Sequence, residues 1–304
     1  MRHVGQNDKF QAGYRSLAAR CAVAALATAA VLTGCSGPGS PGSAPAGQGG
    51  PAGAPGAASA RLSEQRRMVA AARKWRLDQV PLTAPAPPRT KPRITARAGF
   101  QVDHQEYENL PPVFTTVPTE KKIVFLTIDD GAEKDPRFLR MMRELKVPYT
   151  AFLSDYLVKD DYGYFRKSQA YGNTLDNHTL THPYLPGLSY KQQRQEICGM
   201  QDIMEKQYGK RPEVLRPPYG DYDQDTLRAA KSCGIKYAPI WNEEVFVDHW
   251  EYREDDQRLH KGDIVLTHFR GTGEWNGTMI DDMRRFLNKV TREGYAVARL
   301  EDYL

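Results

Sequence analysis

Hydrophobic runs alternate with amphipathic segments along the C-terminal two thirds of the chain. Residues 123–126 are all apolar, which predicts a buried strand, and residues 149–153 and 264–267 predict two further strands. Helices are predicted from Asp135-Pro136 onward, between the cap residues Ser189 and Gly209, and over residues 225–233 and 279–291. This order predicts an α/β domain over residues 100–304 whose largely parallel sheet is open or closed into a barrel.

The N-terminus has the pattern of an export signal. Basic residues up to Arg20 precede an apolar stretch over residues 21–32, which is shorter than the roughly 20 residues of a membrane span. The stretch ends in Leu-Thr-Gly-Cys, which resembles a bacterial lipobox and makes Cys35 the expected lipidated residue at the end of a 1–35 signal peptide. The alternative is a plain secretory signal in which Cys35 occurs by chance.

Two segments separate this signal from the globular domain. Residues 36–60 contain only Gly, Pro, Ala, Ser and one Gln, so we expect a disordered, flexible tether. Residues 61–99 form a basic spacer. A short helix is predicted over residues 61–79, and the five prolines between residues 81 and 92 end regular secondary structure.

The charge distribution narrows the function classes. The net charge of +5 divides into +3 over residues 1–35, +8 over 36–99 and −6 over 100–304. An acidic domain disfavours nucleic-acid binding, and 26% charged residues exclude a polytopic membrane protein. The positive charge of the basic spacer is suited to binding an anionic membrane surface or wall polymer. The alternative is a solvated spacer that binds neither.

Two adjacent carboxylates end the strand predicted at residue 123. Asp129 and Asp130 stand before Gly131, at the carboxyl end of a strand where α/β folds place their sites. Successive strand side chains point to opposite faces, so the pair shares a site only if the backbone turns, which Gly131 permits. In the functional interpretation, one of the two carboxylates is a metal ligand and the other is a general base. In the alternative interpretation, the pair is only a solvated acidic turn.

Two histidines add metal-ligating capacity. His178 and His182 are four residues apart, which on a helical turn places both imidazoles on one face. With Asp130 they make a two-His, one-carboxylate set that leaves coordination positions open for water and substrate, as catalytic sites do.

Two further segments carry polar groups. Residues 216–220, Arg-Pro-Pro-Tyr-Gly, form a stiff turn that displays the guanidinium of Arg216, which can pair with a carboxylate. His268 ends the strand predicted at residue 264 and is a candidate general acid. Each segment alone also fits a structural role.

The order of these four elements resembles the polysaccharide deacetylases of carbohydrate esterase family four, with their NodB-homology domain. The family motif Thr-Phe-Asp-Asp-Gly corresponds to Thr-Ile-Asp-Asp-Gly at 127–131, and His-Ser/Thr-x-x-His to residues 178–182. Arg-x-Pro-Tyr-Gly corresponds to residues 216–220 and Leu-x-His to 266–268. The resemblance covers residues 110–304 and implies a distorted (β/α) barrel.

The resemblance also implies a metal site and a base. Asp130, His178 and His182 would bind a divalent metal, most often Zn²⁺, with Co²⁺ or another divalent ion as alternatives. Asp129 would be the general base that activates water, and Arg216 would hold Asp129 and favour its charged form.

The remaining implied roles concern the substrate. The backbone N–H of Tyr219 would help to bind the oxyanion, His268 would protonate the leaving amine, and Leu266 would line the pocket for the acetyl methyl group. Among the tryptophans, Trp250 is our candidate for a sugar-binding surface, and core packing is the alternative.

The fourth family motif is missing. Asp-x-x-Asp-Trp, whose acid tunes the catalytic His, does not occur, and the region reads Trp-Asn-Glu-Glu-Val-Phe-Val-Asp-His-Trp. Asp248 and Glu244 are the two candidates for the partner of His268. Elsewhere, Cys198 and Cys233 are a candidate disulfide in an exported protein, and two buried thiols are the alternative.

We therefore expect a metal-dependent hydrolase that removes N-acetyl groups from an extracellular polysaccharide, either peptidoglycan or a chitin-like glucosamine polymer. The alternatives are an O-acetyl esterase on xylan-type polymers and a catalytically weak carbohydrate-binding lipoprotein on the same fold. We expect a monomer that does not bind nucleic acid. It would be anchored to the outer face of the membrane through a lipid at Cys35, or be secreted.

Overall fold

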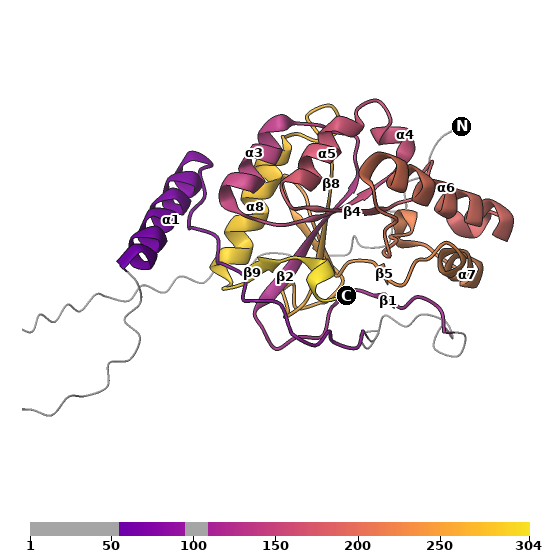
Figure 1. Ribbon diagram of the computed structural model, residues 1–304, viewed down its shortest axis with the longest axis horizontal. Helices are drawn as coiled ribbons and strands as arrows, with labels where there is room; N and C mark the ends of the chain where they lie inside the picture. The colour runs from indigo at the N-terminus through magenta and orange to yellow at the C-terminus, as the bar shows by residue number, and fades with distance from the viewer. Residues whose placement is uncertain (1–54, 95–108) are drawn as a thin grey trace, which may run out of the picture. The chain divides into compact units, whose positions relative to one another are not determined.

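The computed structural model describes residues 55–94 and 109–304 (Figure 1). The predicted signal peptide, Cys35 and residues 36–54 of the predicted tether lie outside the described residues, as do residues 95–108. In the described part of the chain, no helix combines the length and the apolar character needed to cross a membrane.

Helices and strands alternate along most of the described chain. The elements in chain order are α1 Pro55–Lys74, β1 Val113–Phe114, β2 Ile123–Asp130, α3 Pro136–Leu145, β3 Thr150–Leu153, α4 Asp155–Val158, α5 Tyr162–Ala170, β4 Thr174–Asn177, η1 Leu185–Gly187, α6 Tyr190–Tyr208, η2 Pro218–Gly220, α7 Gln224–Ser232, β5 Ala238–Pro239, β6 Glu243–Val245, β7 Trp250–Tyr252, β8 Ile264–His268, α8 Met279–Arg292, β9 Ala296–Ala298 and η3 Leu300–Asp302.

The main sheet has the strand order β4-β3-β2-β8-β6-β7, and β9 also pairs with β2. All of these pairs are parallel except β6 with β7. The predicted α/β class with a largely parallel sheet is confirmed. Helices α3 and α8 lie side by side against the strands (Figure 1).

Single bridges continue the pairing beyond the main sheet. The segment 214–215 bridges to Asn177 of β4 on one side and to Tyr237, next to β5, on the other. Strand β5 pairs with β1, and Thr116, just after β1, bridges to Asp263 before β8. Together with the main sheet, these bridges connect the strands around most of a closed ring. The complete distorted barrel stays a prediction.

Local sequence signals account for the helix ends that we predicted. The side chain of Asp135 accepts a hydrogen bond from the backbone N–H of Arg137, with proline at the first helical position of α3. Ser189 forms a capping box with Gln192 at the start of α6, which ends at Gly209 in the left-handed conformation, φ 76°.

Strand β2 is the centre of the core, and all eight of its residues are buried. Val124, Leu126 and Ile128 face the larger hydrophobic cluster, which includes Phe138 of α3 and Phe286 of α8. Ile123 and Phe125 face a second cluster with Phe114 and Tyr303. Since side chains alternate along a strand, Thr127 and Asp129 project toward the side of this second cluster.

The helix predicted for the basic spacer is present but differs from the expectation in two ways. It begins at Pro55, inside the segment that we expected to be tether, and it packs against α3. Trp75, which follows it, is buried, and its indole N–H donates to Glu144 at 2.8 Å. Lys74 pairs with the same Glu144 at 2.7 Å. Ala71, Ala72 and Trp75 join the core, whereas Leu62 and Val69 are exposed, so one face of the helix is packed and the other is solvated.

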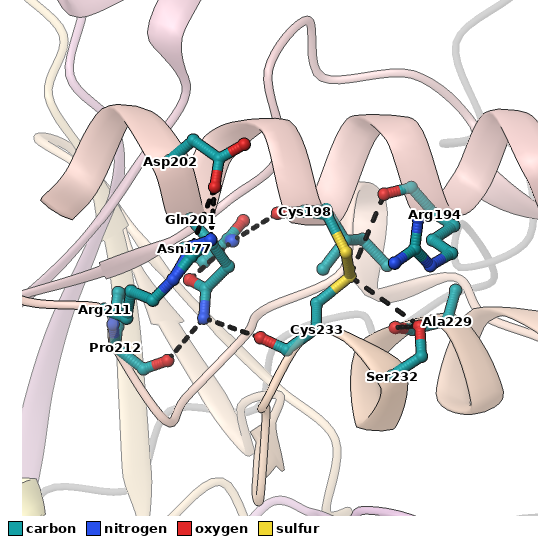
Figure 2. The surroundings of a disulfide bond; sticks show 11 residues. Asn177, Arg194, Cys198, Gln201, Asp202, Arg211, Pro212, Ala229, Ser232 and Cys233 are labelled. Atoms are coloured by element: carbon teal, nitrogen blue, oxygen red, sulfur yellow. Dashed lines mark hydrogen bonds and ion pairs between the residues drawn. A yellow bond between two sulfur atoms is a disulfide. The ribbon is translucent and has the colours of Figure 1, made fainter. Parts of the chain in front are cut away.

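A disulfide joins α6 to the end of α7, because Cys198 and Cys233 are bonded with a Cα–Cα distance of 5.1 Å (Figure 2). The pairing that we expected as one of two alternatives is therefore the one in the structure. The bridge closes a segment of 35 residues that contains Arg216.

We predict that the double substitution Cys198→Ser/Cys233→Ser lowers the free energy of unfolding by about 4 kcal/mol, because the open chain regains the entropy of a loop of this length. Urea denaturation followed by circular dichroism measures the change. Reduced wild-type protein is the control and should lose a similar amount. A double variant as stable as the oxidised wild type would contradict the prediction.

Candidate active site

The two carboxylates at the end of β2 reach the same imidazole although they are neighbours in a strand. The Nε2 atom of His178 lies 3.6 Å from Asp129 Oδ2 and 3.7 Å from Asp130 Oδ1. Asp130 itself has φ 77° and Gly131 has φ 95°. These left-handed residues turn the backbone, as the sequence required, and a Cβ added at Gly131 would lie 2.4 Å from Val158 Cγ1.

The two histidines meet in a way that the sequence analysis did not foresee. His178 and His182 lie in an irregular loop after β4, and not on the helical turn that we expected. Thr179 and His182 have φ 72° and 56°, and the Thr179 hydroxyl accepts a hydrogen bond from the His182 N–H at 3.1 Å. The ring centroids are 4.8 Å apart. The loop achieves the proximity that we had attributed to helical spacing.

Asp130, His178 and His182 form a cluster whose ligand atoms could hold one metal ion. Asp130 Oδ1 is buried without a hydrogen-bond partner and lies 3.4 Å from His182 Nε2. His178 Nδ1 lies 2.7 Å from the backbone carbonyl of Arg216, to which it must donate. That bond leaves the lone pair of Nε2 directed at Asp130. The donor set therefore fits a divalent ion such as Zn²⁺.

Burial prepares these groups for metal binding at neutral pH. It lowers the pKa of both imidazoles, His178 and His182, to about 4, so both are neutral at pH 7. Burial raises the pKa of Asp130, but the neighbouring His268 and His178 outweigh it, and the net pKa lies below its ordinary value. A neutral imidazole pair beside an ionised carboxylate is the form that binds a metal.

Arg216 is completely buried and links the strands around the site. Its Nη1 donates to Asp129 Oδ1 at 2.8 Å and to Thr127 Oγ1 at 2.9 Å. Its Nε and Nη2 donate to the carbonyls of Pro239 and Ile240. The guanidinium carbon also lies 4.4 Å from the centre of the Phe152 ring.

Asp129 keeps one oxygen for Arg216 and directs the other at the metal-ligand cluster. Burial raises the pKa of its carboxyl to about 6, although Arg216 and His268 lower it. Arg216 favours the charged form, as expected, but burial has the larger effect. The net pKa is therefore near neutrality, which suits a general base.

His268 has a carboxylate partner, which the sequence left open between two acids. Its Nδ1 lies 3.2 Å from Glu244 Oε1, whereas Asp248 is exposed and pairs with His249. Burial lowers the pKa of His268, but Glu244 outweighs it and the net pKa is raised. In the parallel β6–β8 register Glu244 is opposite Leu266, so it shares a face with His268.

Of the residues expected to contact the substrate, Leu266 and Tyr219 lie near the candidate site and Trp250 packs elsewhere. Leu266 is buried on the same face of β8 as His268, and the exposed Tyr219 ring lies 4.6 Å from that of His182. Trp250, our candidate for the sugar surface, instead stacks on Phe286 of α8. Trp275 is the tryptophan beside His268, at a centroid distance of 6.5 Å.

Arg270 is a site residue that the sequence analysis missed. Its Nη2 donates to Asp130 Oδ2 at 3.0 Å, and it also pairs with Glu274. Arg270 lies two residues beyond His268 at the end of a predicted strand. This position in the sequence was the one signal that could have identified it as a site residue.

The loop that carries the histidines is held from behind by buried amides. Asn177 Oδ1 accepts a hydrogen bond from the Thr179 N–H at 2.8 Å, and its Nδ2 donates to Gln201 Oε1 at 3.0 Å. Gln201 in turn donates to the carbonyls of Pro212 and Cys233 (Figure 2). The disulfide and the histidine loop therefore share one hydrogen-bonded network.

Comparison with known proteins agrees with this geometry. The family model described as polysaccharide deacetylase matches residues 116–238. An uncharacterized protein of Streptomyces coelicolor is 40% identical over 66% of this chain and 81% of its own length. The peptidoglycan-N-acetylmuramic acid deacetylase PdaA of Bacillus subtilis is 25% identical over 61% of this chain and 73% of its own.

Among solved structures, a family 4 carbohydrate esterase from Bacillus anthracis has the same fold, with a TM-score of 0.53 and 22% identity over 72% of this chain and 98% of that one. The family model covers the motifs at 127–131, 178–182 and 216–220, and the Leu-x-His motif at 266–268 reaches the site through β8. On these grounds the chain belongs to the polysaccharide deacetylase family of hydrolases.

Proposed function

We propose that this protein removes N-acetyl groups from an extracellular polysaccharide with the help of a divalent metal, and that zinc is the metal. One observation carries the proposal: two neutral imidazoles and an orphaned carboxylate oxygen converge on one point, flanked by Asp129 and His268. Peptidoglycan is the substrate that we favour, because several named relatives are peptidoglycan deacetylases.

Asp130, His178 and His182 would hold the metal. When bound, a divalent ion lowers the pKa of water and polarises an amide carbonyl. Asp129 would accept the proton of the attacking water, because its pKa of about 6 leaves it ionised at neutral pH. Arg216 holds Asp129 in place through Nη1.

The second half of the reaction needs an acid. His268 would give a proton to the departing amine, and Glu244 favours the protonated imidazole by raising its pKa. The N–H of Tyr219 would stabilise the developing oxyanion, and Leu266 would line the pocket for the acetyl methyl group. Trp275 is a better candidate than Trp250 for contact with the sugar, because it lies beside His268.

Acetate release by the purified protein tests the activity. We expect release from peptidoglycan and from N-acetylglucosamine oligomers, loss of release after chelation and recovery with Zn²⁺ or Co²⁺. Asp129→Asn should lower kcat by about 10²–10⁴, because a general base contributes that much. Asp248→Asn, a surface change of the same chemistry, is the matched control and should keep wild-type activity.

Two outcomes would contradict the proposal. Release from acetylxylan alone would indicate an O-acetyl esterase. Metal binding without release from any of these substrates would indicate a carbohydrate-binding protein.

The role of Glu244 is tested by the pH dependence of kcat/KM. His268 acts in its protonated form, so activity falls as the pH rises through its pKa. Glu244→Gln removes the charge that raises this pKa. We expect the basic limb of the profile to move to lower pH. An unchanged basic limb would exclude Glu244 as the positioning acid.

We also propose that the protein is exported and anchored by a lipid at Cys35, where the sequence resembles a lipobox. The substitution Cys35→Ala should release the protein from the membrane fraction, because the acyl chains supply the anchor. Fractionation followed by immunoblotting measures the distribution, with Cys21→Ser, a cysteine within the predicted signal peptide, as the cysteine control. Retention of the Cys35→Ala protein in membranes would overturn lipidation.

A further inference from the structure

A second cluster of metal-ligating side chains lies at the other end of β8. Glu243 is the first residue of β6, Asp263 directly precedes β8, and His260 stands in the loop between β7 and β8. One ligand atom from each of these three residues lies within 4.8 Å of the others. None of the roles proposed above uses this cluster.

Burial makes two neighbouring carboxylate charges costly, although Asp263 accepts hydrogen bonds from the Thr116 hydroxyl at 3.0 Å and from the His260 backbone N–H at 2.5 Å. Glu243 is 1% exposed and Asp263 is completely buried. Asn242 donates to Glu243 Oε1 at 2.9 Å, but Oε2 of the same carboxyl is buried with no hydrogen-bond partner. Two neighbouring buried carboxylates repel each other, and a bound cation or a shared proton relieves the repulsion.

His260 adds a ring nitrogen to the two carboxylates of the cluster. Its Nε2 lies 3.0 Å from Asp256 Oδ2, which fixes the ring. Its Nδ1 is buried without a hydrogen-bond partner, 3.3 Å from Asp263 Oδ2 and 3.6 Å from Glu254 Oε2. One ring nitrogen thus bonds an oxygen while the other faces carboxylates. His178 in the candidate active site is arranged in the same way, except that its Nδ1 bonds the oxygen and its Nε2 faces the carboxylates.

The cluster is separate from the active site. In the β6–β8 register Glu243 is opposite Val265 and Glu244 opposite Leu266, so the two glutamates project to opposite faces. Asp263 and His268 are separated by the length of β8, about 16 Å for five residues of parallel strand. The two clusters therefore cannot share one ion.

We propose that Glu243, His260 and Asp263 bind a second divalent cation of the zinc type. The imidazole ligand disfavours Ca²⁺ and Mg²⁺, which prefer oxygen ligands alone. The ion fastens the loop 253–262 to the bases of β6 and β8. These two strands carry Glu244 and His268, so the role of the site is structural.

Metal stoichiometry of the full chain, prepared without an affinity tag, tests the proposal. After equilibration with Zn²⁺ and gel filtration, mass spectrometry of the metal content should give two ions per wild-type chain. We expect one ion for Asp130→Ala, one for His260→Ala and none for the double variant. Zn²⁺ should raise the melting temperature of Asp130→Ala and leave that of the double variant unchanged.

His249→Ala is the matched control, because His249 is an exposed histidine that pairs with Asp248, and it should keep two ions. If His260→Ala does not fold, the near-isosteric Glu243→Gln replaces it and should also bind one ion.

One ion in the wild type, with His260→Ala and Glu243→Gln unchanged in stoichiometry, would overturn the proposal in favour of a shared proton. That result, obtained with acetate release intact, leaves the proposed function standing. Two ions without acetate release would overturn the function alone.

Discussion

The buried ion pair between Arg216 and Asp129 is the interaction on which the rest of the site depends. A completely buried guanidinium is stable only when its donors are satisfied, and here the carboxylate, a hydroxyl and two backbone carbonyls satisfy them. The same residue also offers its own carbonyl to His178 Nδ1. Arg216 therefore fixes both the candidate base and one candidate metal ligand, and loss of either member of the ion pair would leave an uncompensated buried charge.

Strand alternation decides which of two neighbouring acids reaches which site. Glu243 and Glu244 follow each other in β6, so one faces the second metal-ligating cluster and the other faces His268. At the end of β2 the same rule would separate Asp129 from Asp130. A left-handed residue at Asp130 breaks the alternation there, and the two carboxylates meet at one imidazole.

Several residues of the candidate active site have unfavourable backbone conformations. Asp130, Thr179, His182 and Tyr219 all have positive φ, in three separate motif segments. Such residues cost of the order of 1 kcal/mol each and persist only where the surroundings determine them. Here the buried network of Asn177 and its neighbours, together with the packed core below β2, offsets that cost.

The sequence by itself determined the central strands β2, β3 and β8, the helices α3, α6, α7 and α8, and most of the residues of the candidate site. The apolar run of β2, the caps of α3 and α6 and four short motifs are local signals, because strand burial and helix capping depend on neighbouring residues. The tertiary structure decided the rest. Only strand register brings Glu244 to His268, and only a loop of positive φ brings His178 to His182. The packing of the N-terminal helix and the displacement of Trp250 onto α8 likewise depend on residues distant in sequence, which periodicity and spacing cannot report.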